Sequence, residues 1–221
     1  MMVEISTSIL NVNEENCVKT FYNIETAKTD YFHIDVMDGE FVENNNIELM
    51  KDYALKISHI SNIPLDVHLM CRDVRKSIDE FIDLKPDRIT FHIEAVKDKD
   101  EAIAIIRYLQ ENNIKACMAI SPDTDIEKIY DFLPYIHMCL VMTVVPGKGG
   151  QKLIPEMVEK IKKLNEYINI NNIDIDIEAD GGIDNTNSSV LINSGVNILV
   201  SGSYIINSEN YHDAIENLRK E

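Results

Sequence analysis

Short apolar runs recur along the chain, and between them lie polar stretches in which apolar residues return every three or four positions. The short runs are typical of buried strands, and the wider spacing is typical of amphipathic helices. Glu101–Leu109 and Met157–Ile168 show the helical spacing, and Asp73 and Asp125 precede other helical stretches as expected N-caps. The predicted strands are Val3–Leu10, Tyr31–Met37, Leu65–Met70, Arg88–Ile93, Ala116–Ile120, Cys139–Val145, Asp174–Ala179 and Ile198–Ser201.

This alternation predicts the fold class. Strands separated by helices run parallel, and eight strand-like runs alternate with about eight helical stretches in 221 residues. An open, doubly wound sheet would satisfy the same alternation, but eight units in this length favour a closed barrel. No linker or composition break divides the chain. We therefore predict an α/β protein, a single (β/α)8 TIM barrel domain over residues 1–221.

Charge and hydropathy narrow the possible partners. The formal net charge of −17 argues against a nucleic acid or an anionic membrane, because both require a basic surface. An anionic substrate would need local compensation from backbone amides, a lysine or a metal. No apolar run of about 18 residues is present, so no membrane span is expected.

The termini and cysteines bear on the compartment. The N-terminal Met1-Met2-Val3-Glu4 lacks the basic start of a signal peptide. The four cysteines show no paired spacing of the zinc-ribbon or redox kind, and most lie in apolar contexts. We expect reduced, buried thiols and a cytoplasmic protein.

Four residues with metal-ligand chemistry lie towards the ends of the predicted strands. His33 and Asp35 share one face of the second strand because strand side chains alternate, and His68 and Asp180 belong to the ends of the third and seventh. Chemistry in such barrels sits at the carboxyl ends of the strands. A lone residue there is more often a cap, but four together favour a divalent-metal site whose carboxylates can move protons. The other polar residues at these ends are Ser8 and His92, of which His92 is not expected to be a ligand.

Glycine-bearing segments follow the last three predicted strands: Pro146–Gly150, Gly181-Gly182 and Gly202-Ser203. Glycine allows backbone amides to approach an anion closely, and these barrels often bind phosphate in the loops after strands seven and eight. Each glycine pair alone is usually a tight turn. Together they indicate a phosphate site, to which Lys148 could add a point charge.

Longer motifs make a family resemblance specific. The stretches HIDVMDGEFVENN, LDVHLM, VMTVVPGKGGQKLIPEM, IEADGGI and VSGSYI resemble ribulose-phosphate 3-epimerases in order and spacing, from Ser6 to Ser203. The resemblance implies a (β/α)8 barrel of the ribulose-phosphate-binding type. It also implies one divalent metal ion and inversion of carbon 3 of a phosphorylated ketose.

The resemblance assigns roles residue by residue. It implies that His33, Asp35, His68 and Asp180 bind the metal, which mixed nitrogen and oxygen ligands leave open among Zn, Fe, Mn and Co. It also implies that Asp35 and Asp180 are the two acid/bases and that the metal stabilises a cis-enediolate. Implied substrate-binding residues are Ser8, His68, Gly147, Lys148, Gly149, Gly150, Gly181, Gly182, Gly202 and Ser203. Methionines that line the site or simply pack in the core are Met37, Met70 and Met142.

Departures from the family pattern concern recognition and leave the implied ligands intact. Glu43 replaces a common proline, and Val145 and Lys148 replace residues of the usual N-P-G-F-G-G, with Lys148 where phenylalanine is usual. The leading expectation is interconversion of D-ribulose 5-phosphate and D-xylulose 5-phosphate. D-allulose 6-phosphate, with one more carbon, is an alternative substrate that the loops at residues 43–48 and 145–153 would decide.

Two further readings compete on fold grounds. One is a phosphosugar-binding barrel without catalysis, against which the intact Asp35 and Asp180 argue. The other is a barrel decarboxylase, whose D-x-K-x-x-D motif is absent because no lysine follows Asp35 at that place. The expected partner is a small-molecule ketose phosphate. The resemblance also implies a possible homo-oligomer formed through the outer helices.

Overall fold

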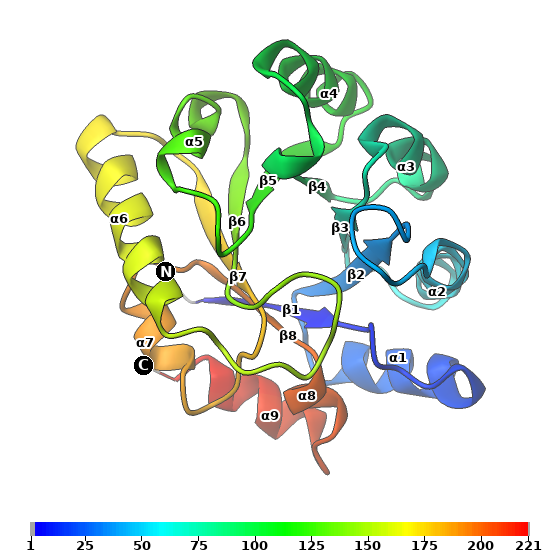
Figure 1. Cartoon of the computed structure of the whole chain (residues 1–221). Coiled ribbons are helices and arrows are strands. Elements are labelled where there is room, and N and C mark those ends of the chain that lie inside the picture. Colours follow the sequence, from blue (N-terminus) through cyan, green and yellow to red (C-terminus); the bar gives the residue numbers. More distant parts are fainter. Residues whose placement is uncertain (1–2, 221) are drawn as a thin grey trace.

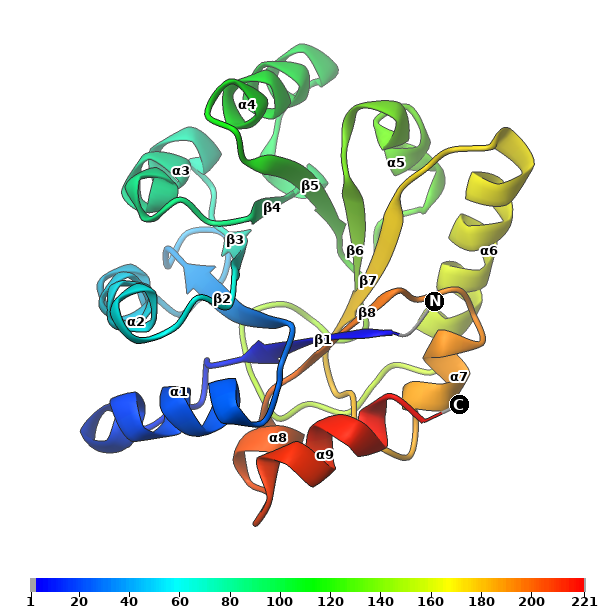
Figure 2. The same cartoon turned by 180° about the vertical axis from the view of Figure 1, so that it is seen from behind.

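The computed structural model describes residues 3–220, in which eight parallel strands close into a barrel (Figures 1 and 2). Each strand pairs with the next along the chain, and β8 pairs with β1 to close the ring. The predicted (β/α)8 TIM barrel is therefore confirmed. The strands are β1 (Glu4–Ser8), β2 (Tyr31–Met37), β3 (Leu65–Met70), β4 (Arg88–His92), β5 (Lys115–Ile120), β6 (Met138–Met142), β7 (Asp176–Asp180) and β8 (Ile198–Ser201).

Helices surround the barrel (Figure 1). They are α1 (Cys17–Thr26), α2 (Ile47–Ile60), α3 (Val74–Phe81), α4 (Lys99–Glu111), α5 (Glu127–Tyr130), α6 (Glu156–Asn171), α7 (Ser188–Ile192), α8 (Ser203–Ile206) and α9 (Tyr211–Leu218). Short 3-10 turns lie at Glu14–Asn16, Ile82–Leu84, Ile93–Ala95 and Leu133–Tyr135. In α2 the buried residues Met50, Tyr53, Ala54 and Ile57 follow the helical period, so one face of the helix is covered.

The core has two parts. The larger cluster joins the outward side chains of the strands to the buried faces of the helices. The smaller cluster is contributed chiefly by β5, β6 and β8 and consists of Cys117, Ala119, Met138, Leu140, Met142, Val144 and Ile198. Buried polar residues such as Ser6, His33 and Asp66 instead come from β1, β2 and β3. The polar residues inside the barrel therefore lie mainly away from the apolar cluster of β5, β6 and β8.

The strand boundaries differ from the predicted ones where polar residues begin or end a run. β7 starts at Asp176 rather than Asp174 and includes Asp180, which pairs in register with Met142 of β6. The predicted bounds of the second and third strands, Tyr31–Met37 and Leu65–Met70, are confirmed, but the expectation that His33, Asp35 and His68 close these strands is wrong. These residues lie inside their strands, which continue to Met37 and Met70.

One predicted helix start is confirmed and one is wrong. The carboxylate of Asp73 accepts a hydrogen bond from the backbone N–H of Lys76 at 3.1 Å, as an N-cap does. Asp125 does not cap α5, which begins at Glu127. The preceding Ile126 already has right-handed helical dihedral angles, so the chain turns before a side-chain cap can form.

The cysteines and the hydropathy of the helices agree with the expectations from sequence. Cys17, Cys71, Cys117 and Cys139 are all buried and none is disulfide-bonded. Within residues 3–220, every helix is too short or too polar to span a bilayer.

Candidate metal centre and active site

Strand geometry brings His33, Asp35, His68 and Asp180 together inside the barrel. Each offers one ligand atom, and these atoms all lie within 4.8 Å of one another. His33 and Asp35 share a face of β2 because they are two residues apart. The parallel register sets Asp35 beside His68 of β3. We call these four residues the His/Asp cage.

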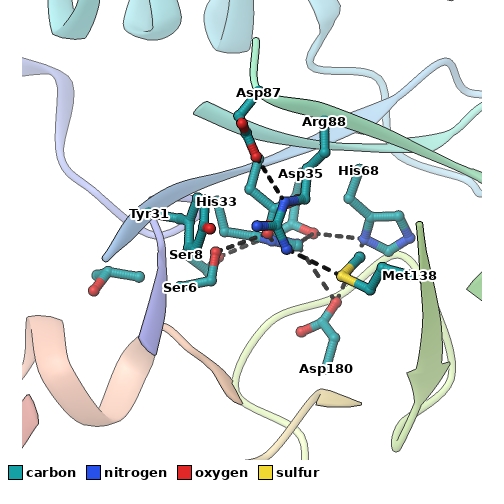
Figure 3. Close-up of polar contacts among 12 residues, drawn as sticks. Ser6, Ser8, Tyr31, His33, Asp35, His68, Asp87, Arg88, Met138 and Asp180 are labelled. Carbon is teal, nitrogen blue, oxygen red and sulfur yellow. Dashed lines mark hydrogen bonds and ion pairs between the residues drawn. The ribbon is translucent and has the colours of Figure 1, made fainter. Parts of the chain in front are cut away.

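The distances within the His/Asp cage are short and all involve the side chains that face one another in Figure 3. His33 Nε2 lies 3.4 Å from Asp35 Oδ1 and 3.8 Å from Asp180 Oδ2. His68 Nδ1 lies 3.2 Å from Asp35 Oδ1 and 3.4 Å from Asp180 Oδ2. Both imidazoles are fully buried, whereas 6% of the Asp35 side chain and 13% of the Asp180 side chain are exposed. The carboxylates thus face the solvent side of the cage.

The donor set fits a divalent cation. His33 Nε2 is buried and has no hydrogen-bond partner, although it points at two carboxylates. A buried polar atom without a partner is costly, and a cation among these four donors would satisfy it. Two imidazole nitrogens and two carboxylate oxygens suit first-row transition metals. The described geometry is therefore that of a candidate metal site.

The pKa shifts in the cage follow from the same contacts. Burial acts most strongly on His33 and disfavours its charge, but the carboxylates of Asp35 and Asp66 outweigh burial and raise the pKa of His33 well above its ordinary value. The pKa of Asp35 lies well below its usual range, since contact with His33 and His68 outweighs burial. Hydrogen bonds with Asp180 and Asp35 raise the pKa of His68 against burial. Without a metal the cage therefore retains protons on its histidines.

Below the cage, Asp66 orients His33, and sequence reasoning missed this residue. The ring nitrogen Nδ1 of His33 lies 2.9 Å from Asp66 Oδ2, to which the hydroxyl of Ser6 also donates at 2.8 Å. A carboxylate can only accept, so Nδ1 keeps a proton and Nε2 is the nitrogen that can act as a ligand. Asp66 shares a face of β3 with His68, and this parity was the signal available in the sequence.

A second group of ionisable residues was also missed. His33, Asp66 and Glu178 could themselves hold a cation by distance. Burial and the nearby Asp66 carboxylate raise the pKa of Glu178 well above its ordinary value. Arg88 is 3% exposed, lies 4.0 Å from the ring of Tyr31 and pairs with Asp87 at 3.3 Å (Figure 3). A second metal ion among His33, Asp66 and Glu178 is disfavoured, because Nδ1 of His33, the nitrogen that faces Asp66, carries a proton.

His92 lies outside the cage, as expected from the sequence. Its Nε2 is 2.9 Å from Nε2 of His68, the nitrogen that faces away from the carboxylates. The two rings stack with centroids 5.1 Å apart. His92 thus contacts a cage ligand without offering an atom to the cage itself.

One pocket contains nearly all the substrate-binding residues that the resemblance implies. Asp35 and Asp180 line it, together with residues of the loops that follow β1, β6, β7 and β8. His68 is not part of its lining and lies below it. Expected residues that do line the pocket are Ser8, Met37, Met70, Met142, Gly147, Lys148, Gly149, Gly150, Gly181, Gly182, Gly202 and Ser203.

Two glycines after β7 are required by the backbone. Gly181 has φ +124°, and a Cβ there would lie 2.3 Å from a methyl group of Val144. Gly182 has φ +66°, and a Cβ there would lie 2.4 Å from the backbone nitrogen of Leu153. Neither position accepts a side chain without displacement of its neighbours. The glycines therefore let the loops after β6 and β7 pack together beside the pocket.

The loop after β6 is tied to the loop after β2. The side-chain amide of Asn44 donates to the carbonyl of Gly147 at 2.7 Å. The ammonium of Lys148 lies 3.8 Å from the carboxylate of Glu43, and both side chains are largely exposed. In Figure 1 the yellow-green loop after β6 crosses the end of the barrel that faces the viewer. Two of the residues that depart from the family pattern, Glu43 and Lys148, therefore meet beside the pocket.

Comparison with known proteins agrees with this geometry. The model of the ribulose-phosphate 3-epimerase family matches residues 4–206. The chain belongs to this family. A ribulose-phosphate 3-epimerase of Methanocaldococcus jannaschii is 36% identical over 219 residues, covering 99% of this chain and 91% of that protein. One of Bacillus subtilis is 32% identical over 219 residues and covers 99% of both chains. The family resemblance inferred from the motifs is therefore confirmed.

Solved structures of other enzymes share the fold of this epimerase family member. A 3-keto-L-gulonate-6-phosphate decarboxylase of Vibrio cholerae superposes with a TM-score of 0.72 at 12% identity, covering 99% of this chain and 95% of that chain. A 3-hexulose-6-phosphate synthase superposes with a TM-score of 0.67 at 11% identity, covering 99% of this chain and 98% of that chain. At such identities the likeness concerns the barrel alone.

Proposed function

We propose that this protein is a metal-dependent epimerase that interconverts D-ribulose 5-phosphate and D-xylulose 5-phosphate. The observation that carries the proposal is the position of Asp35 and Asp180. Both carboxylates belong to the His/Asp cage and both line the pocket above it. Family membership and the names of the relatives support the same activity.

Inversion at carbon 3 requires removal of its proton from one face and addition of a proton to the other. Asp35 and Asp180 come from β2 and β7, which are not neighbours in the barrel, so they approach a bound ligand from different sides. In one direction, one carboxylate takes the carbon-bound proton and the other, initially protonated, donates to the opposite face. The reverse reaction exchanges their roles, and no electrons are gained or lost overall.

A metal held by His33, Asp35, His68 and Asp180 supplies positive charge against the negative charge that develops when carbon 3 loses its proton. Carboxylates are weak bases, so this compensation is needed for them to accept a proton from carbon. Neighbouring side chains orient the carboxylates. Ser8 donates from Oγ to Asp35 Oδ2 at 2.7 Å, which fixes the carboxylate while Oδ1 stays with the histidines.

The glycine-bearing loops that line the pocket are suited to a phosphate. Gly149, Gly181, Gly182 and Gly202 line it and leave room for backbone amides to reach an anion. Lys148 brings the only positive side chain in the described lining of this pocket. A protein with a net charge of −17 needs such local compensation to hold a phosphate dianion.

The proposal is tested by proton NMR in D₂O with the zinc-, iron-, manganese- or cobalt-loaded protein. D-ribulose 5-phosphate and D-allulose 6-phosphate are supplied in parallel, and deuterium at carbon 3 and the new epimer are quantified. We expect exchange and epimerisation with the five-carbon sugar. Turnover of the six-carbon sugar alone would overturn the substrate assignment, and exchange with neither sugar would overturn the epimerase itself.

A further inference from the structure

A chain of hydrogen bonds leads away from the His/Asp cage on the side of β4. His68 Nε2 lies 2.9 Å from His92 Nε2, and His92 Nδ1 lies 3.1 Å from Glu94 Oε2. His92 is the last residue of β4, and Glu94 belongs to the 3-10 turn that follows it. The chain therefore links a cage ligand on β3 to a carboxylate near the surface.

Packing restricts the ring of His92 to this orientation. Its side chain is fully buried, and it is covered on one side by His68 and on another by Phe41, with ring centroids 5.1 Å and 4.8 Å away. A flipped ring would place carbon atoms opposite the nitrogen of His68 and the oxygen of Glu94. The hydrogen bonds and the packing thus favour one arrangement.

Glu94 is held at both oxygens. Oε2 faces His92, and Oε1 accepts a hydrogen bond from the backbone N–H of Ser121 at 2.9 Å. Burial acts most strongly on Glu94 and would raise its pKa, but the hydrogen bonds with His92 and Ser121 hold it at about 2. Glu94 is therefore a carboxylate at neutral pH, and a carboxylate can only accept hydrogen bonds.

The proton positions follow in order along the chain. Because Glu94 accepts, the proton of neutral His92 lies on Nδ1 and its Nε2 is an acceptor. Because His92 Nε2 accepts, His68 carries its proton on Nε2. The remaining nitrogen of His68, Nδ1, points at Asp35 and Asp180, and it offers a lone pair to a cation once the proton that it shares with these carboxylates has left. The carboxylate of Glu94 thereby determines which nitrogen of His68 is available to bind a metal.

We propose that His92 and Glu94 are positioning residues that hold His68 with its proton on Nε2 and its Nδ1 lone pair directed into the cage. This proposal rests on the metal site of the proposed function. Neither residue donates an atom to the metal or to the substrate. Partners of this kind, behind a metal-ligating histidine, usually change metal affinity by about 10- to 100-fold when removed.

The first test measures zinc affinity by competition with a chromogenic chelator. His92→Phe keeps a stacked ring but removes the acceptor, whereas His92→Gln keeps an oxygen near the position of Nε2. We expect zinc affinity to fall about 10- to 100-fold in His92→Phe and less than about threefold in His92→Gln. A role in packing alone predicts the opposite order, and wild-type affinity in His92→Phe would overturn the proposal. His59→Gln, on the exposed face of α2, is the matched control.

The second test does not require a metal. The chain has six histidines, so their tautomers are resolvable by long-range nitrogen–proton NMR of the histidine-labelled, metal-free protein at alkaline pH. We expect the proton of His68 on Nε2 and that of His92 on Nδ1. Glu94→Gln should change these proton positions, because the amide has one oxygen and cannot accept hydrogen bonds from both His92 and Ser121 as the two carboxylate oxygens do. A wild-type His68 with its proton on Nδ1 would overturn the inference. Absence of zinc binding in the wild-type protein would overturn the metal site instead.

Discussion

The hydroxyl of Ser8 donates a hydrogen bond of 2.7 Å to Oδ2 of Asp35, while Oδ1 of the same carboxylate faces His33 and His68. The two oxygens of Asp35 thus have different partners. A hydrogen bond to a charged group contributes about 1.5–3 kcal/mol, which is enough to affect both the orientation and the basicity of the carboxylate.

Ser8→Ala should therefore lower kcat by about tenfold or more, since Asp35 loses the contact that fixes its angle to the substrate. Steady-state kinetics with D-ribulose 5-phosphate measure the change in kcat. The zinc affinity of Ser8→Ala should fall by a smaller factor than its kcat. Ser58→Ala, on the exposed face of α2, is the control. An unchanged kcat in Ser8→Ala would contradict the assigned role.

Asp66→Asn should weaken metal binding about 10- to 100-fold. The amide can donate to Nδ1 of His33, which moves the ring proton to Nε2 and blocks the nitrogen that faces the cage. Ser6→Ala is the matched control, because it removes one hydrogen bond of Asp66 and leaves the contact with His33. Chelator competition with zinc measures both variants. Equal affinity in Asp66→Asn and the wild type would show that Asp66 does not set the tautomer.

Metal binding should depend on pH through His33 and His68, whose pKa values are raised above the ordinary 6.5 by carboxylates that outweigh burial. Protons then compete with the metal, so the apparent affinity should fall by about tenfold per pH unit for each displaced proton below the raised pKa values. Chelator competition from pH 6 to pH 9 measures the slope. A flat profile would contradict proton competition at the histidines.

The metal-free protein should show the opposite trend in stability. Because the folded-state pKa values of His33 and His68 are raised, their charged forms stabilise the fold fully below pH 6.5. This contribution is lost as the pH rises above 6.5 through the raised values. Urea denaturation of metal-free and zinc-loaded protein at several pH values separates the two trends.

Lys148→Met should raise KM for the sugar phosphate by up to about fivefold and leave kcat nearly unchanged, because an exposed charge contributes at most about 1 kcal/mol. Lys148 lines the pocket, and its ammonium lies 3.8 Å from the exposed carboxylate of Glu43. Lys152→Met, an exposed residue of the same loop, is the control. If both variants raise KM equally, the effect comes from overall charge and not from a contact with the phosphate.

The sequence was sufficient to predict the barrel and the residues of the cage. Alternation of side chains placed His33 with Asp35, and the βα order placed His68 and Asp180 at the same end of the barrel. Strand bounds were predicted unevenly, since β7 begins at Asp176 and not at Asp174 and includes Asp180. The bounds of β2 and β3 agree with the predicted runs, but His33 and His68 were expected to close these strands, whereas the strands continue to Met37 and Met70.

The partners of the cage could not be predicted in the same way. Asp66 and Glu178 are charged, and a charged residue in a strand is usually read as exposed to solvent. Side-chain alternation puts Asp66 on the same face of β3 as His68, but the contact of Asp66 with His33 and the burial of both acids are seen only in the packed barrel. The pairing of His92 with His68 depends on side-chain rotamers on two strands. Neither spacing nor composition encodes that information.

The central claim is that Asp35 and Asp180 act on opposite faces of carbon 3, and the most direct measurement is deuterium exchange at that carbon in Asp35→Asn and Asp180→Asn. Each variant is incubated in D₂O with D-ribulose 5-phosphate and, separately, with D-xylulose 5-phosphate. We predict no epimerisation in either variant, and exchange with only one epimer in each, the two variants favouring different epimers. Epimerisation at the wild-type rate in either variant would contradict the two-carboxylate account.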